Sequence, residues 1–148
     1  LHSLLDGREA AVRREGLFVV GAMLTQGLAH PAKCIPYVMA LELDVGPQGC
    51  AELAKKELRR QYDRYQPMVA APGAFLDGAL RGYQLQHSLA AAAELRRWDD
   101  VDALAGTLSG AYAEVSGKAE FEALHPELKE AMRRAHVDAR HAGVVYRG

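Results

Sequence analysis

The stretch LTQGLAHPAKCIPYVMALELD, residues 24–44, indicates two helices joined by a short turn. The first helix is expected to end near Gln26, because Gly27 can adopt the left-handed backbone conformation that commonly terminates a helix. Pro31 suits the first turn of the next helix, where its missing N–H removes no hydrogen bond. Pro36 lies further in, where a proline does remove one. We therefore predict that the second helix is bent at Pro36.

The rest of the chain shows the same helical periodicity and no long alternation of period two. In the first helix, the apolar residues expected to face a core are Val12, Leu17, Val20, Leu24 and Leu28. Short turns rich in Pro, Gly and Asp separate the helices. The expected helices span about residues 6–26, 31–43, 48–65, 72–93, 99–117 and 126–143. The sequence therefore predicts an all-α fold of about six helices.

The first four expected helices pair into two units, residues 6–43 and 47–93, of about forty residues each. This spacing is typical of HEAT or armadillo repeats, in which successive helix pairs stack into an α-solenoid. We therefore expect HEAT-like helix pairs over residues 1–93 and further helices over residues 94–148. A compact helical bundle is the alternative arrangement of the same helices.

The generic HEAT signature is matched only in part. That signature places an aspartate in the turn inside a repeat and an arginine soon after it, early in the second helix. Asp44 fits the turn, whereas Cys50 stands about where the arginine would fall. The chain is therefore a degenerate match to the repeat.

The composition is that of a folded globular chain and gives little indication of a partner. Hydrophobic residues make up 49% of the 148 residues and charged residues 25%. The formal net charge of −1 does not indicate binding to nucleic acid or to a membrane. The longest apolar run, Leu17 to Leu24, is too short to span a bilayer. Because the chain opens on Leu1 and stops at Gly148, we expect a segment of a longer protein.

Motifs of known enzyme classes are missing from the sequence, including the P-loop, the dinucleotide fingerprint, G-x-S-x-G and H-E-x-x-H. His30, Cys34 and Cys50 could be considered as zinc ligands, but no fourth ligand stands at a usual spacing. Two cysteines are also too few for a disulfide scaffold and fit a reducing compartment. His136 and His141 are expected on opposing sides of a surface helix. We therefore expect no metal, no cofactor and no catalytic residue.

The string KKELRRQYDR, residues 55–64, carries five basic residues against two acidic ones. We call these five the basic ridge: Lys55, Lys56, Arg59, Arg60 and Arg64. One interpretation is a ridge that contacts phosphates of DNA, or a partner, on one face of the solenoid. The other is the ordinary charged side of an amphipathic helix, supported by pairs such as Glu52–Lys56. The second is favoured because the remaining chain is not basic.

The stretch at residues 24–44 resembles the C-terminal HEAT region of the Nipped-B family, the large subunit of the cohesin loader. Members carry a helix ending in Q-G-L, then a small residue, H-P, and an apolar run with a second proline at the same offset. The residues that match this motif are Gln26, His30, Pro31 and Pro36. The resemblance continues into a helix containing G-Y-Q-L-Q, residues 82–86, and covers about residues 14–90.

This resemblance implies a nuclear, non-enzymatic protein without membrane association. Loaders of this family form a hook-shaped solenoid that binds the Smc heads and kleisin of cohesin together with DNA, and stimulates the cohesin ATPase. The small loader subunit is bound elsewhere in the full-length protein. The matched residues Gln26, His30, Pro31 and Pro36 are expected to be structural: a helix end, a cap and a kink. No catalytic residue is carried over, because the family supplies none.

Two other classes of protein stay open on the sequence. One is a HEAT or armadillo adaptor or scaffold in trafficking or phosphatase assembly, against which the family motif argues. The other is a small helical enzyme with an unrecognised site. A pocket formed by His30, Cys34 and His87 with shifted pKa values would favour that enzyme.

Overall fold

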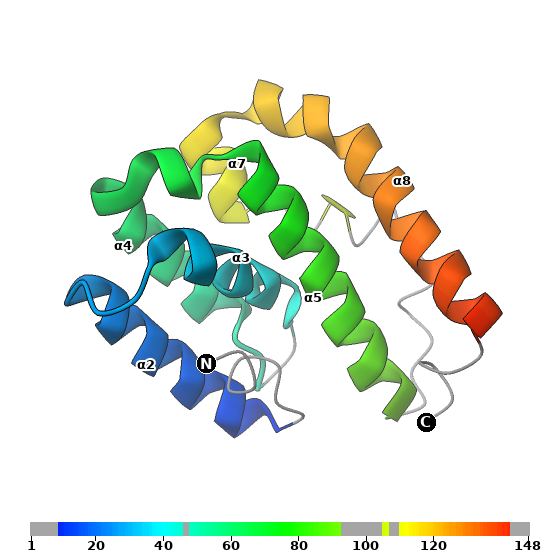
Figure 1. Ribbon diagram of the computed structural model, residues 1–148, viewed down its shortest axis with the longest axis horizontal. Helices are drawn as coiled ribbons and strands as arrows, with labels where there is room; N and C mark the ends of the chain where they lie inside the picture. The colour runs from blue at the N-terminus through cyan, green and yellow to red at the C-terminus, as the bar shows by residue number, and fades with distance from the viewer. Residues whose placement is uncertain (1–8, 46–47, 93–104, 107–109, 143–148) are drawn as a thin grey trace.

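A computed structural model describes residues 9–45, 48–92, 105–106 and 110–142 of the chain. Within these ranges the structure consists of six α-helices and one short 3-10 helix, with no strand (Figure 1). In chain order they are α2 (Ala10–Thr25), α3 (Pro31–Ala40), η1 (Leu41–Leu43), α4 (Ala51–Val69), α5 (Pro72–Ala92), α7 (Gly110–Ser116) and α8 (Lys118–Ala142). The predicted all-α fold is therefore confirmed.

The helices stack in two layers, as in a helical-repeat protein. In one layer α2 packs against α4 and α4 packs against α7, while in the other α3 packs against α5 and α5 packs against α8. Contacts also join α2 with α3, α4 with α5, and α7 with α8, so consecutive helices form pairs. Figure 1 shows α5 between α3 and α8. This order of neighbours is that of a HEAT-like repeat segment rather than a compact bundle.

The turn between α2 and α3 is formed by residues that act locally. Gly27 has a φ of 73°, the left-handed conformation that ends α2. The next helix begins at Pro31, where a missing N–H costs nothing. The Nδ1 atom of His30 accepts a hydrogen bond from the N–H of Ala32 at 3.2 Å, so the imidazole caps α3.

Two apolar residues expected to face the core do not do so. The side chain of Val12 is 39% exposed and that of Leu28 is 68% exposed, whereas Arg13 is buried. Arg13 is drawn inward by a buried carboxylate, which turns its neighbour Val12 toward solvent. Leu28 follows the left-handed Gly27, so the chain has already left the axis of α2 at that point. The remaining apolar residues, Leu17, Val20 and Leu24, are buried as predicted.

The helices α3 and α5 pack closely in the layer formed by α3, α5 and α8. Residues Cys34 to Ala40 of α3 are all buried, and the helix continues through Pro36. The bend predicted at Pro36 stays a prediction. A Cβ atom added at Gly78 of α5 would lie 2.8 Å from the carbonyl oxygen of Pro36. One added at Gly82 would lie 2.6 Å from the carbonyl oxygen of Ala40. Both glycines are therefore required for this packing.

The helix α4 differs from the expected one at its C-terminal end. It was expected to end at Tyr65, closed by Pro67, but it continues to Val69 across a kink at Tyr65, with φ −129° and ψ 42°. Because a proline has no N–H and crowds the turn before it, the regular helix is interrupted just ahead of Pro67. The regular helix thus ends where predicted, and the additional turn brings Val69 into the core.

The last helix begins earlier than predicted. Its expected start, Pro126, lies inside α8. Gly117, with a φ of 92°, ends α7 and lets α8 begin directly after it. Pro126 removes one hydrogen bond from a helix of 25 residues. The longer helix in return places Phe121, Leu128 and Met132 on one buried face.

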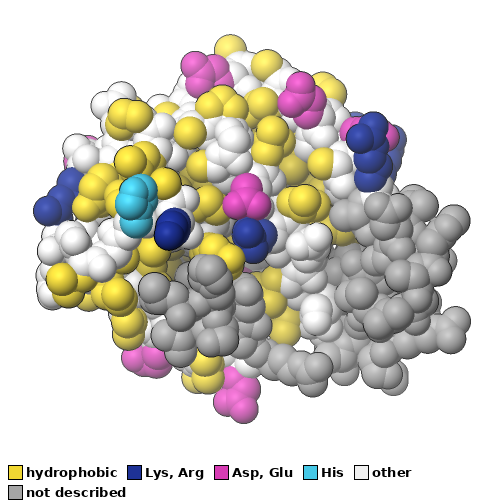
Figure 2. Space-filling view, in the orientation of Figure 1, with side chains coloured by type: hydrophobic (Ala, Val, Ile, Leu, Met, Phe, Trp, Pro, Cys, Tyr) yellow, Lys and Arg dark blue, Asp and Glu magenta, His cyan; other side chains and the backbone are white. Residues whose placement is uncertain are grey.

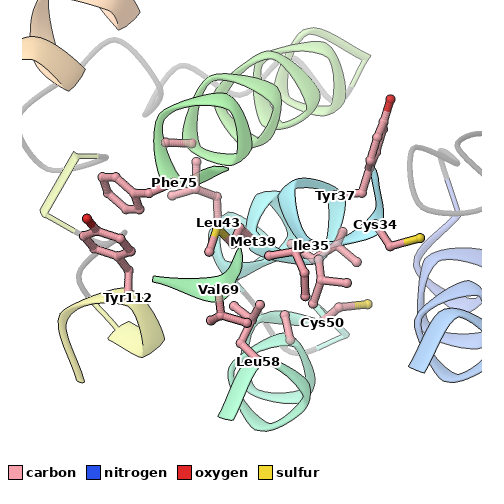
Figure 3. Packing of buried hydrophobic residues seen from close by; sticks show 14 of the residues in the cluster. Cys34, Ile35, Tyr37, Met39, Leu43, Cys50, Leu58, Val69, Phe75 and Tyr112 are labelled. Atoms are coloured by element: carbon pink, nitrogen blue, oxygen red, sulfur yellow. The ribbon is translucent and has the colours of Figure 1, made fainter. Parts of the chain in front are cut away.

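Aromatic stacking connects the last two helices to the rest of the fold. The rings of Phe75 in α5 and Tyr112 in α7 are stacked with centroids 4.1 Å apart (Figure 3). The ring of Phe121 meets Phe75 edge-on at 5.7 Å. These residues belong to the same hydrophobic core as those of α2 to α4. Of the predicted helix at 99–117, residues 99–104 and 107–109 lie outside the described residues.

We expect Gly82→Ala to lower the free energy of unfolding by about 1–3 kcal/mol, because the added methyl group would overlap the carbonyl oxygen of Ala40. Gly73→Ala, in the first turn of the same helix, is the matched control. A Cβ there meets nothing within 4 Å, so stability should stay equal or rise by up to about 1 kcal/mol. Urea unfolding followed by circular dichroism measures both. Equal effects of the two variants would contradict the close contact between α3 and α5.

Candidate interaction surface

A buried carboxylate, that of Asp44, joins α2, α4 and α5. Arg13 of α2 donates two hydrogen bonds to it, from Nε to Oδ2 at 3.0 Å and from Nη2 to Oδ1 at 3.1 Å. The N–H of Cys50 donates to Oδ2 at 3.1 Å, and Nε2 of Gln86 in α5 donates to Oδ1 at 3.2 Å. Asp44 is 3% exposed and Arg13 is 5% exposed, so each charge depends on the other. We call this group the Asp44 hub.

The backbone of residues 49–51 packs against the backbone of Asp44. The N–H of Ala51 donates to the carbonyl oxygen of Asp44 at 3.1 Å. A Cβ atom at Gly49 would overlap that same oxygen, so only glycine fits there. The arginine that the repeat signature lacks at Cys50 is supplied instead by Arg13 of α2. Sequence reasoning missed Arg13, because nothing local distinguishes it from the exposed arginines.

The thiols of Cys34 and Cys50 are buried and unreactive near neutral pH. Burial, together with the neighbouring carboxylate of Asp44, raises the pKa of Cys50 to about 11. Burial also raises the pKa of Cys34. Both are therefore protonated near neutral pH and poorly suited to act as nucleophiles. Within the part of the chain that the structure describes, no group of three or more His, Cys, Asp and Glu could hold a metal ion. The side chains of His87, His136 and His141 lie outside it.

The four motif residues lie in the α2–α3 turn and in α3. The N–H of Gln26 donates to the carbonyl of Ala22 at 3.0 Å, and its side chain is exposed. His30, which caps α3, is also exposed, whereas Pro36 is buried. These positions suit a helix end, a cap and a packed helix interior. Among the described residues, no helix is both long and apolar enough to cross a membrane.

The basic ridge lies along α4, and its Arg59 pairs with Glu114 of α7. The Nε atom of Arg59 lies 2.6 Å from Oε2 of Glu114, and Nη2 lies 2.8 Å from Oε1. These hydrogen bonds lower the pKa of Glu114 and raise the pKa of Arg59. Both side chains are about half exposed, so solvent weakens the attraction between them. The pair nevertheless occupies the guanidinium and joins neighbouring helices of one layer.

Two further arginines of the ridge reach the C-terminal end of α2. Arg60 donates to the hydroxyl of Thr25 at 2.5 Å, and Arg64 donates to the carbonyl oxygen of Thr25. The hydroxyl of Tyr65 donates to the carbonyl oxygen of Leu24 at 3.0 Å. The residue at the kink, Tyr65, thus takes part in the contact between α4 and the C-terminal end of α2. Cationic and polar donors here satisfy the free carbonyl groups and partial negative charge of the helix end.

Glu57 lies between the two helices at this contact. Its Oε1 accepts a hydrogen bond from Nε2 of Gln61 at 2.6 Å, and its Oε2 lies 3.8 Å from Nη1 of Arg60. A Cβ atom at Gly21 of α2 would lie 2.6 Å from Oε1 of Glu57. The two helices therefore approach closely where Gly21 leaves room for the carboxylate.

The two lysines complete the ridge. Nζ of Lys55 lies 3.4 Å from Oε1 of Glu52 within α4. Glu52 therefore pairs with Lys55, whereas the sequence predicts a pair with Lys56. Lys56 is exposed. On the face of the molecule shown in Figure 2, basic and acidic side chains are likewise interspersed with apolar ones. The structure thus brings acidic partners to the ridge instead of leaving it a continuous field of positive charge.

Comparison with known proteins assigns the chain to a family. The family model described as Sister chromatid cohesion C-terminus matches residues 1–132. The chain is 30% identical over 83 residues to Nipped-B-like protein A of Danio rerio and to Nipped-B-like protein of Homo sapiens. In each case the match covers 55% of this chain and 3% of the relative. No solved structure matches the chain.

We expect Asp44→Ala to lower the free energy of unfolding by about 3–5 kcal/mol, because it removes the carboxylate that the buried guanidinium of Arg13 faces. Replacing both partners, as Arg13→Met with Asp44→Asn, should cost less than Asp44→Ala alone, because no buried charge then remains. Glu114→Ala, which breaks an exposed pair, is the control and should have a much smaller effect. Chemical unfolding of the three proteins tests the order. A loss for Glu114→Ala as large as that for Asp44→Ala would contradict the central role of the hub.

The Arg59–Glu114 pair is expected to stabilise the chain at neutral pH and not in acid. Because the pKa of Glu114 is lowered in the folded chain, its contribution is present above the ordinary value of 4.5 and is lost as the pH falls through the folded value. Glu114→Gln should therefore reduce stability at pH 7 and have no effect in strong acid. Unfolding curves across this pH range measure the difference, with Glu127→Gln on α8 as the control. A difference from the parent chain that does not change with pH would speak against the pair.

Proposed function

Because this chain belongs to the sister chromatid cohesion C-terminus family, we propose that it is a segment of a cohesin-loading factor that acts in the nucleus. The full-length protein binds the Smc heads and kleisin of cohesin together with DNA. It promotes the loading of cohesin onto chromatin by stimulating the cohesin ATPase. The small loader subunit binds elsewhere in the full-length protein.

The match over residues 1–132 is the observation that supports this proposal. It extends from α2 to most of α8, so helices of both layers lie in the matched region. It also reaches beyond the stretch at 14–90 on which the sequence resemblance depends. The chain spans only 3% of the curated relatives that it matches, so the activity of the whole protein is carried over from the family. A trafficking or phosphatase adaptor is not favoured by this match.

We propose that the segment itself has no catalytic role and acts by differential binding. In this mechanism the ATPase of cohesin carries out the chemistry, and the loader stabilises the arrangement of the Smc heads that leads to loading. Helices that share one core present their surface residues in fixed positions. Little conformational entropy is then lost when the partner binds.

The basic ridge is the proposed contact surface, and its charge pattern favours a protein partner over DNA. The acidic groups interleaved with it or facing it are Glu52, Glu57, Asp63 and Glu114. DNA affinity arises mainly from cations that replace the counterions of phosphates, and an arginine already paired with a carboxylate contributes less to that exchange. A surface of alternating charge instead suits a protein with a complementary pattern. We therefore propose that α4 contacts a cohesin subunit.

Affinity capture of the tagged full-length protein from its own nuclei, followed by mass spectrometry, tests this function. We expect Smc and kleisin subunits to be recovered. Lys55→Glu with Lys56→Glu reverses two ridge charges without altering the three arginines that hold neighbouring helices, and should reduce this recovery several-fold. Arg133→Glu with Arg134→Glu on the exposed side of α8 makes the same change in charge and is the control.

Each other outcome has a distinct meaning. Vesicle-coat or phosphatase subunits in place of cohesin would favour the adaptor and overturn the proposal. Equal recovery by the two variants would remove the ridge as the contact surface while leaving the loader function standing. A loss of DNA affinity confined to the ridge variant, with a reduced dependence on salt, would assign the ridge to DNA.

A further inference from the structure

The C-terminal end of α2 holds a hydroxyl group beside two guanidinium groups. Thr25 is the last residue of α2 and is exposed. Its hydroxyl accepts hydrogen bonds from Arg60 at 2.5 Å and from Nε2 of Gln61 at 3.4 Å. Arg64 donates to the carbonyl oxygen of the same residue. Arg60 and Arg64 are one helical turn apart on α4, so both reach the same point.

The positive charge at this point exceeds what a neutral hydroxyl requires. Oε2 of Glu57 lies 3.8 Å from Nη1 of Arg60, and Oε1 of Glu57 already accepts a hydrogen bond from Gln61 at 2.6 Å. One donor would satisfy the carbonyl of Thr25, yet a second guanidinium is directed at its hydroxyl. Arg60 binds the hydroxyl and Arg64 the carbonyl oxygen of one residue, so two guanidinium groups converge where a phosphate on that hydroxyl would lie.

We propose that Thr25 is a phosphorylation site whose phosphate is held by Arg60 and Arg64. A protein kinase transfers the γ-phosphoryl group of ATP. The Oγ atom of Thr25 forms a bond to the γ-phosphorus, the bond from that phosphorus to the bridging oxygen breaks, and ADP leaves. The hydroxyl proton passes to the catalytic base of the kinase. The inference does not depend on the identity of the partner of the basic ridge.

The segment around Thr25 is open to a kinase. Residues 26–30 are not helical, and Gln26, Gly27 and Leu28 are exposed, with Leu28 at 68%. The hydroxyl of Thr25 donates to the carbonyl of Gly21 at 2.9 Å, a single bond in the last turn of the helix. Terminal turns open at the lowest free energy, so Thr25 can be presented without unfolding the core.

The phosphate would change both the contact between α2 and α4 and the charge of the ridge. It carries a charge of about −1.5 to −2 near neutral pH and offers three acceptor oxygens. Both arginines would then be bound to it, which strengthens the connection between the helices. The same event removes two of the five cations from the basic ridge. Phosphorylation at Thr25 thus makes the surface of α4 more acidic.

Mass spectrometry can identify the modification without ambiguity. Trypsin cleaves after Arg14 and Lys33, and the peptide at 15–33 contains Thr25 as its single Ser, Thr or Tyr. We expect a phosphorylated fraction of this peptide when the full-length protein is purified from its own cells in the presence of phosphatase inhibitors. Recovery of the peptide only in its unmodified form, from dividing and from arrested cells, would overturn the proposal.

Titration of the phosphate tests whether the two arginines hold it. Phosphothreonine is placed at position 25 of the 148-residue chain during translation, and its ³¹P resonance is followed with pH. The second pKa should be lower than in the Arg60→Gln/Arg64→Gln variant. At the pH where the phosphate of the Arg60→Gln/Arg64→Gln variant is half titrated, the phosphate of the parent chain should be roughly tenfold more abundant as dianion than as monoanion. The Arg133→Gln/Arg134→Gln variant is the matched control and should titrate as the parent does. Identical titrations for the parent and the Arg60→Gln/Arg64→Gln variant would show that the arginines do not receive the phosphate.

Discussion

The carboxylate of Asp44 is the interaction on which the described structure depends. It lies in the interior, where an ionised group without partners would be strongly unfavourable. It accepts four hydrogen bonds, two on each oxygen, from α2, from the residue before α4 and from α5. One side chain therefore sets the positions of three helices that are distant in sequence. Because hydrogen bonds are directional, the hub specifies orientation as well as proximity, which apolar packing alone does not.

Close packing around the hub gives the repeat its layers. Gly78 and Gly82 let α5 approach the backbone of α3, and Gly21 lets α2 approach α4. The arginines of α4 then occupy the two sides of that helix, where they contact Thr25 of α2 and Glu114 of α7. The same side chains are thus structural connections and part of the proposed contact surface. A change in charge at these arginines therefore also acts on the stacking of the helices.

The sequence predicts more of the fold than of the candidate site. Helix ends at Gly27 and Pro31 follow from residues within one turn, and the periodicity of the apolar residues is sufficient for the all-α class. The start of α8 was predicted wrongly, because a proline was taken as a helix start although the helix tolerates it inside. The basic ridge was recognised as a set of residues. Its acidic and polar partners were not, since Thr25 and Glu114 are 35 and 55 residues from the arginines that bind them.

By itself, the sequence determined the all-α class, the turn between the first two helices and the family, because these depend on local spacing and on a short motif around His30 and Pro31. Only the tertiary structure decided that Arg13 is buried while its neighbour Val12 is exposed, and that three arginines of α4 are engaged by neighbouring helices. The physical reason is that a charged side chain is positioned by the carboxylate, hydroxyl or carbonyl group that accepts its hydrogen bonds, and the fold decides where that group lies. For Arg13 that partner is 31 residues away, across a stack of helices that no local pattern describes.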